Sequence, residues 1–291
     1  MGYMLAVAVS LLYSLWYILS GALVSLSPNT SPIFTWMLIE ATSATLMFII
    51  AKGDLKIEKL SDLKYPISSA AAYALGNYIF YILIAMNGVP AASAFGTAEI
   101  IIFTLLIWVT TKRDVNMAMY SFASAIIAAG LVIESLVIRN GIYSLNGSLI
   151  ALGLLIAVFY GAATYFYYLS TKRIKSKFTT MFFIQAPQVL IFGASVLLFV
   201  PASNMPAITG WYALLTVIVG AVLLASFYFE TLMMKVLANV GRGAVATGYI
   251  LSDMQLIPVV VYYLIVNPGA WQTYVPGLLL VTIGLAMLDW K

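Results

Sequence analysis

Long apolar runs recur along the whole chain, and they constrain the fold more than any other feature of the sequence. An α-helix rises 1.5 Å per residue, so a run of roughly 18 or more apolar residues can cross a hydrocarbon core of about 30 Å. Of the 291 residues, 63% are hydrophobic and 8% are charged, whereas soluble domains hold about 45–50% and about 25%. The sequence therefore predicts an all-α integral membrane protein with ten transmembrane helices. We place these helices at residues 3–26, 33–51, 66–87, 91–111, 117–138, 147–170, 179–200, 211–234, 243–266 and 273–290.

The chain contains no Cys and no His. This composition excludes disulfide frameworks, thiolate or imidazole metal sites, and every mechanism in which His activates a nucleophile. The first apolar run begins close to Met1, has no basic segment before it and is longer than the core of a signal peptide. We therefore expect it to be retained as a transmembrane helix.

Basic residues lie almost entirely on one side of this predicted topology. Only Arg139 falls on the opposite side. The positive-inside rule then places both termini in the cytoplasm of a multi-pass protein of the cell membrane, which we expect to be prokaryotic. A cytoplasmic collar accounts for these charges, so we expect the lipid bilayer and no nucleic acid as a partner, and a monomer or weak homodimer. The residues on the cytoplasmic side are Lys52, Lys56, Lys59, Lys64, Lys112, Arg113, Lys172, Arg173, Lys175, Lys177, Lys235, Arg242 and Lys291.

The two halves of the chain, 1–145 and 146–291, repeat one another. A constant shift of 154 carries residues 72–134 onto the second half without a gap, and a shift of 147 relates Tyr13 to Tyr160. Because each half holds an odd number of helices, we expect the second five-helix repeat to be inverted in the membrane, an arrangement typical of transporters. The pairs at the shift of 154 are Tyr73 with Phe227, Ala92 with Ala246, Phe95 with Tyr249, Glu99 with Asp253, Ala123 with Gly277 and Gly130 with Gly284.

Loose motifs recur in the same order in both halves. They are Leu11-Leu12-Tyr13-Ser14-Leu15-Trp16, its counterpart Ala157-Val158-Phe159-Tyr160-Gly161, the run from Tyr81 to Ala94 that includes Asn87-Gly88-Val89-Pro90, and Leu256-Ile257-Pro258-Val259-Val260 followed by Gly277 and Gly284. In order and repetition, over essentially the whole chain, they resemble the drug/metabolite transporter superfamily and specifically its EamA-type members.

The resemblance implies export or exchange of small metabolites by alternating access. It also implies a cavity formed by spans one to four and six to nine, braced by spans five and ten. Bacterial aromatic amino acid exporters are the members that the chain most resembles in length and aromatic content. The chain departs from the family pattern at Thr104, which stands opposite Pro258, and at Arg113-Asp114 and Pro268-Gly269, which replace Gly-Glu pairs.

Three acidic residues fall inside predicted spans, where a charged carboxylate costs on the order of 2.5–3.5 kcal/mol. Glu40, Glu99 and Asp253 have no basic partner within the spans. Each is therefore expected to be protonated, to face water or to bind a cation, which suits proton coupling or recognition of an amine. The alternative is that protonated acids only donate hydrogen bonds between helices. We expect Glu230 to pair with Lys235 near the inner membrane surface, and Glu134 to lie near Arg139 at the outer end.

Aromatic and amide side chains at helical spacing supply the other candidates for substrate binding or coupling. Any one of them could instead be ordinary packing or part of an interfacial belt. We expect a belt for the tryptophans at span ends, which are Trp36, Trp108, Trp211, Trp271 and Trp290. The candidates are Tyr13, Trp16, Tyr17, Asn77, Tyr78, Tyr81, Tyr160, Tyr167, Gln185, Gln188, Tyr228 and Tyr249.

A cavity that holds acids and no bases favours neutral, zwitterionic or amine-bearing solutes over phosphorylated ones, which require Arg or Lys. We therefore expect a secondary transporter, with amino acids bearing aromatic or apolar side chains as the preferred substrates. The sequence implies no cofactor, and proton coupling is left open. A multidrug or lipid-carrier exporter is the first alternative. An intramembrane enzyme using Glu99 and Asp253 as an aspartyl-type hydrolase would, or a cation channel, are the others.

Overall fold

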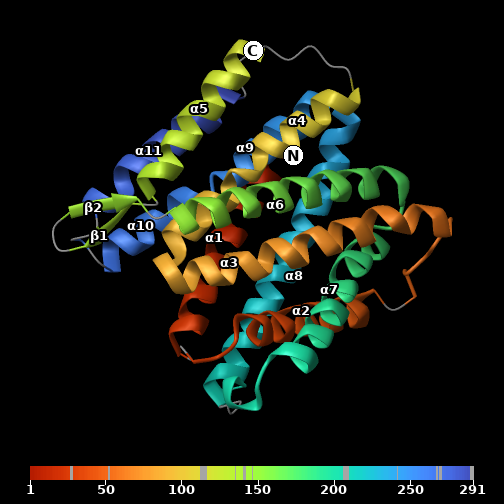
Figure 1. Ribbon diagram of the computed structural model, residues 1–291. Coiled ribbons are helices and arrows are strands. Elements are labelled where there is room, and N and C mark those ends of the chain that lie inside the picture. Colours follow the sequence, from red (N-terminus) through yellow and green to blue (C-terminus); the bar gives the residue numbers. More distant parts are fainter. Residues whose placement is uncertain are drawn as a thin grey trace.

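The computed structural model describes residues 1–26, 29–51, 53–111, 117–134, 136–139, 142–145, 147–205, 210–240, 242–266, 268 and 271–288. Helices make up nearly all of this part of the chain (Figure 1). The elements are α1 (Gly2–Leu26), α2 (Pro32–Ile50), η1 (Leu60–Leu63), α3 (Lys64–Thr97), α4 (Glu99–Thr111), α5 (Met117–Glu134), β1 (Leu136–Arg139), β2 (Ile142–Leu145), α6 (Gly147–Arg173), α7 (Lys177–Phe199), η2 (Ala202–Asn204), α8 (Gly210–Val240), α9 (Arg242–Asp253), α10 (Leu256–Val266) and α11 (Trp271–Leu288).

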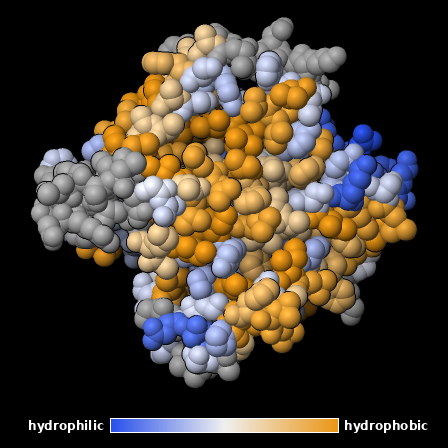
Figure 2. Space-filling view, viewed as in Figure 1, coloured by the Kyte–Doolittle hydropathy of each residue, from blue (hydrophilic) through white to orange (hydrophobic). Residues whose placement is uncertain are grey.

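Eight helical segments are long and apolar enough to cross a membrane, so the chain is a multi-pass membrane protein. Figure 2 shows apolar residues over most of the visible face, with hydrophilic residues gathered where α3 begins and α6 ends. Shorter apolar helices cover Ala118–Ile133 and Tyr274–Leu288. The eight segments are Gly2–Leu26, Pro32–Ile50, Leu60–Met86, Gly88–Thr110, Gly147–Arg173, Lys177–Phe199, Gly210–Val240 and Ala244–Val266.

A short hairpin interrupts the helical architecture and corrects the predicted helix at 117–138. Helix α5 ends at Glu134, and strands β1 and β2 pair antiparallel from Leu136↔Leu145 to Arg139↔Ile142. The sequence carries a signal for this hairpin, because Asn140-Gly141 follows the β-branched pair Val137-Ile138. Hydropathy alone does not separate an apolar strand from the end of an apolar helix.

The helices pack in pairs that join distant parts of the sequence. Helix α3 packs on α6, α1 on α8, α2 on α7, and α5 on α11, which run side by side at one edge of the molecule (Figure 1). Glycines permit the last contact. A Cβ on Gly130 would lie 2.8 Å from the carbonyl oxygen of Gly277, and one on Gly284 would lie 2.9 Å from that of Ala123. The backbones of α5 and α11 can therefore approach closely, as small residues allow between membrane helices.

Helical breaks fall inside two of the predicted spans. The span at 243–266 is divided at Met254 and Gln255, between α9 and α10. Pro258 causes this break, because its ring clashes with the carbonyl of Met254 and it has no N–H to donate. The span at 91–111 is divided at Ala98, between α3 and α4, and an earlier kink lies at Gly88, whose φ of 81° is in the left-handed region that glycine accepts.

Candidate functional site

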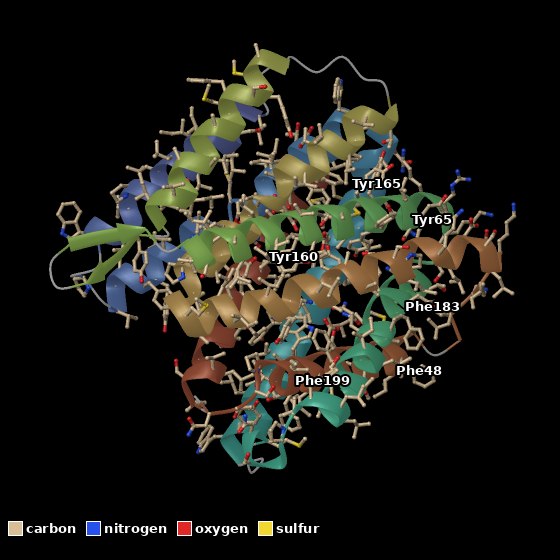
Figure 3. All side chains as sticks on the ribbon, in the orientation of Figure 1. Phe48, Tyr65, Tyr160, Tyr165, Phe183 and Phe199 are labelled. Atoms are coloured by element: carbon tan, nitrogen blue, oxygen red, sulfur yellow. The ribbon has the colours of Figure 1, made fainter. Side chains whose placement is uncertain are left out.

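A small cavity lies among α1, α2, α3, α4, α6, α8 and α9, with a volume of ≈ 50 Å³. Since a water molecule needs about 10–15 Å³ of such space, the cavity has room for a few waters, well short of the roughly 300 Å³ at which ligand pockets begin. Figure 3 shows Tyr160, one of its walls, near the middle of the molecule. The lining residues are Tyr13, Trp16, Tyr17, Trp36, Tyr73, Asn77, Glu99, Tyr160, Leu223, Phe227, Glu230, Tyr249, Ser252, Asp253 and Gln255.

Three carboxyl groups share this cavity. Glu99 is the first residue of α4 and Asp253 the last of α9, so both lie at a helix break, while Glu230 projects from the middle of α8. The three are close enough to interact electrostatically with one another. No Lys or Arg is among the described lining residues. Because like charges repel and burial penalises them, the cluster favours bound protons or an organic cation.

Glu230 is held by two tyrosines and not by a lysine. Tyr13 donates to Oε2 across 2.5 Å, and Tyr249 donates to Oε1. The predicted pairing with Lys235 is wrong, since that ammonium donates to the backbone oxygens of Ile174 and Lys175. The predicted span ended at 234, whereas α8 continues to Val240. Glu230 is therefore about 15 Å from the end of its helix, and it is 2% exposed.

Glu99 and Asp253 are less completely bound than Glu230. The Thr164 hydroxyl lies 3.4 Å from each carboxyl oxygen of Glu99, a long hydrogen bond. Asp253 is buried, and its Oδ2 atom has no partner in the part of the chain that the structure describes. Gln255 accepts the Ser14 hydroxyl on its backbone oxygen, yet its side-chain Oε1 also has no partner there. Two acceptor atoms on the cavity lining are thus free to receive a donor.

Tryptophans form the opposite part of the lining. The Trp16 ring stacks on Phe80 with centroids 5.2 Å apart and meets the Trp36 ring edge-on at 5.6 Å. The predicted membrane-interface position of Trp36 is wrong, because it is 1% exposed inside the helical body. Trp211 and Trp271 are 78% and 56% exposed, as belt residues would be. Among described residues, neither Trp16 nor Trp36 has an acceptor for its buried indole N–H.

A chain of hydrogen bonds leads away from the cavity toward α7. The Tyr160 hydroxyl donates to Oδ1 of Asn77 across 2.6 Å, and Nδ2 of Asn77 donates to Oε1 of Gln188 across 3.0 Å. The amide nitrogen of Gln188 donates to the backbone oxygen of Ile184. These side chains are buried and largely satisfied, so they fix Tyr160 relative to α3 and α7.

The structure brings together eight of the predicted site residues at the cavity: Tyr13, Trp16, Tyr17, Asn77, Glu99, Tyr160, Tyr249 and Asp253. Glu40, Gln185 and Gln188 are buried but outside its lining, with Nε2 of Gln185 donating to Ser43. Tyr81 donates to Ser20, and Tyr167 bonds to Thr231 and to the carbonyl of Phe227.

Two of the predicted tyrosines face other surroundings. Tyr78 is 40% exposed and lines an apolar groove on α3, and Tyr228 accepts a hydrogen bond of 2.8 Å from Lys177. Prediction from the sequence missed Glu230, Trp36, Tyr73, Phe227 and Leu223 as lining residues. The spacing of Leu223, Phe227 and Glu230 at i, i+4 and i+7 was a usable signal, because it places all three on one face of α8.

Metal ligation finds no support among the described residues, where no group of three or more Asp or Glu side chains could hold one ion. The three acids of the cavity are therefore arranged for something other than a shared metal. Protons or an amine fit them better, since either can interact with one carboxyl at a time.

Comparison with known proteins supports the fold and says nothing of the substrate. One solved structure, described as "Crystal structure of protein", is similar to this chain with a TM-score of 0.65 and 13% identical residues, over 97% of this chain and 95% of that one. No protein-family model matches the chain, and no curated protein matches it. At 13% identity the likeness shows a shared fold alone.

Proposed function

We propose that this protein is a secondary transporter of small zwitterionic or amine-bearing solutes, with amino acids bearing aromatic or apolar side chains as the preferred cargo. One observation carries the proposal: the cavity presents acids without bases, together with two free indole N–H donors and two free oxygen acceptors. A zwitterion supplies both complements, because its ammonium donates and its carboxylate accepts. The aromatic walls suit an apolar side chain.

Contacts that exchange between the two halves support an inverted repeat of five helices each, with ten spans in all. Gly130 lies against the backbone of Gly277, and the 154-residue shift turns this contact into that of Gly284 with Ala123. Aromatic contacts behave alike: Tyr13 meets Phe227 at 6.5 Å, and the corresponding Tyr160 meets Tyr73 at 5.9 Å. We infer on this basis, and from the motif resemblance, an EamA-type member of the drug/metabolite transporter superfamily.

The absence of native Cys allows the topology to be tested directly. Single cysteines at Ser61 in η1 and Ser203 in η2 are placed on opposite sides by the ten-span arrangement with cytoplasmic termini. An impermeant maleimide added to intact cells should label Ser203→Cys and should label Ser61→Cys only after lysis. Labelling of both positions, or of Ser61→Cys alone, in intact cells would contradict the topology.

The transport assay uses three solutes that share one aromatic ring and differ in charge. Labelled phenylalanine, phenethylamine and phenylacetate are offered to proteoliposomes of the purified protein. We expect uptake of the first two and not of the anion, and loss of uptake in Glu99→Gln and Asp253→Asn. The surface substitution Glu58→Gln is the matched control for a change from acid to amide, because Glu58 pairs only with the exposed Lys175.

Tryptophan variants separate the two ends of the zwitterion. If the indole N–H groups receive the carboxylate, Trp36→Phe should reduce transport of phenylalanine and leave that of phenethylamine unchanged. Uptake of phenylacetate equal to that of phenylalanine would contradict the role of the acids. Uptake of none of the three by a correctly inserted protein would exclude this substrate class.

A lipophilic cation is the second candidate substrate, as for a multidrug exporter. An apolar groove of ≈ 260 Å³ lies beside the cavity, lined by Ile33, Ala74, Leu75, Tyr78, Ile191, Phe192, Ser195 and Phe199. Phe192 meets the cavity residue Trp36 with ring centroids 6.3 Å apart, so these two rings separate the groove from the cavity. Uptake of tetraphenylphosphonium in place of phenylalanine would favour this candidate.

A further inference from the structure

Glu40 occupies a second buried polar site, apart from the cavity. It is the only ionisable side chain of α2 and is 0% exposed. Within the described residues, neither of its carboxyl oxygens has a hydrogen-bond partner. One turn further along α2, Ser43 accepts a hydrogen bond of 2.7 Å from Gln185, whose own Oε1 likewise lacks a partner there. The site therefore contains oxygen acceptors in excess of donors.

The groups that face Glu40 cannot neutralise a negative charge. Tyr81 of α3 and Tyr160 of α6 interact with it electrostatically, and neither is a cation. The only basic residue on α7 is Lys177, in its first turn, where it bonds to Tyr228.

Helix α8 brings Tyr212, Tyr228, Glu230 and Lys235 to this side of the bundle. Tyr212 shares a hydrogen bond with Thr35 of α2, and Glu230 is bound by its two tyrosines. An isolated ionised carboxylate in apolar surroundings is strongly unfavourable, so Glu40 holds a proton in this arrangement of helices.

We propose that Glu40 is the proton-binding site that couples a pH gradient to transport, separate from the cavity that binds the solute. Its carboxyl group keeps the proton while α2 is packed against α7 and α8 as observed. It releases the proton as H⁺, leaving a carboxylate, when a movement of α2 admits water to it. This inference rests on the proposed transport function and adds to it a division between a substrate site and a coupling site.

Hydrogen bonds give the two sites a physical connection. Tyr160 lines the cavity and also interacts with Glu40. The Tyr160–Asn77–Gln188 chain ends on α7, one turn from Gln185. A solute that displaces Tyr160 would therefore disturb the packing of α7 against α2, which is the change that Glu40 needs in order to lose its proton. Coupling between two sites requires such a shared element with more than one arrangement.

The test compares two modes of phenylalanine transport in proteoliposomes. Counterflow exchange at equal pH requires the substrate site alone, whereas accumulation driven by a pH gradient requires the coupling site as well. One coupled proton can change accumulation by at most about tenfold per pH unit. In Glu40→Gln we expect counterflow at the wild-type rate and no response to the gradient. Glu40→Asp should keep a response, since it retains a group that can bind the proton, and Glu58→Gln should behave as wild type.

Each other outcome has a separate meaning. Gradient-driven accumulation by Glu40→Gln equal to that of wild type would overturn the coupling role. Loss of counterflow in Glu40→Gln, with a wild-type elution profile in detergent, would also overturn it, because Glu40 would then act on the solute or on the packing. Failure of the wild-type protein to exchange phenylalanine or phenethylamine would refute the proposed function, and the inference would fall with it.

Discussion

Tyr13 of α1 donates a hydrogen bond of 2.5 Å to Oε2 of Glu230 on α8, joining two residues that are 217 positions apart in the chain. Tyr249 of α9 donates to the other oxygen, so each carboxyl oxygen has one phenolic donor. Three helices therefore meet at a single carboxyl group on the cavity wall. Any movement between α1, α8 and α9 must break or carry along these two hydrogen bonds.

Replacing Tyr13 with Phe should impair transport while leaving the fold intact. The ring and its packing stay, and one hydrogen bond to a charged or acidic group is lost, which is worth about 1.5–3 kcal/mol. We expect kcat/KM for phenylalanine counterflow to fall by about tenfold or more. Tyr81→Phe is the matched control, because the Tyr81 hydroxyl bonds to Ser20 away from the cavity. Equal effects of the two substitutions would argue against a special role for Glu230.

Replacing Glu40 with Met should raise the stability of the protein. The wild-type carboxyl group is buried without a hydrogen-bond partner among the described residues, and this costs about 1–3 kcal/mol. A methionine of similar length removes that cost and keeps the packing. The melting temperature in detergent should rise, whereas Glu58→Met on the surface should not raise it. A lower melting temperature for Glu40→Met would show that the carboxyl group has a stabilising partner.

Glycine 130 should not tolerate a methyl group. A Cβ there would lie 2.8 Å from the Gly277 oxygen and 3.0 Å from the backbone nitrogen of Val281, so α5 and α11 would have to separate. We expect Gly130→Ala to destabilise the protein by about 1–3 kcal/mol, as overpacking does. Gly193→Ala on α7 meets nothing within 4 Å and should be neutral, or stabilising by up to about 1 kcal/mol, because alanine favours a helix. Thermal unfolding of the two variants in the same detergent measures the difference.

Substituting Pro258 with Ala should reduce transport without loss of stability. An alanine could donate its N–H to the carbonyl of Met254, which would extend α10 through the break and displace Asp253 at the end of α9. We expect slower phenylalanine counterflow together with an unchanged or higher melting temperature. Pro187→Ala in the middle of α7 is the control, since Pro187 does not line the cavity. Wild-type counterflow in Pro258→Ala would show that the break is not needed for transport.

Local chemistry explains which parts of the fold could be predicted. Hydropathy is a property of consecutive residues, so the long membrane-crossing helices follow from the sequence directly. The hairpin at 136–145 did not, because β-branched apolar residues suit both a strand and the end of an apolar helix. The count of ten spans and the inverted repeat stay predictions.

The site was harder to predict because it depends on which face of each helix turns inward. Asn77 and Tyr78 are neighbours on α3, where successive residues point in different directions around the helix, and only Asn77 lines the cavity. Trp36 seemed to lie at the end of a span, but its burial depends on Trp16 and Phe192 from two other helices. Contacts of this kind are tertiary, and no local pattern in a single sequence reports them.

The narrow central cavity has a consequence for the kinetics of the proposed cycle. At ≈ 50 Å³ it cannot hold an aromatic amino acid, so the protein can adopt this conformation only while unloaded. An obligatory exchanger reorients only when it carries a solute, whereas a protein that closes around so little space has a conformation suited to an empty return step. Net efflux into a medium without solute should then proceed at a rate comparable to exchange.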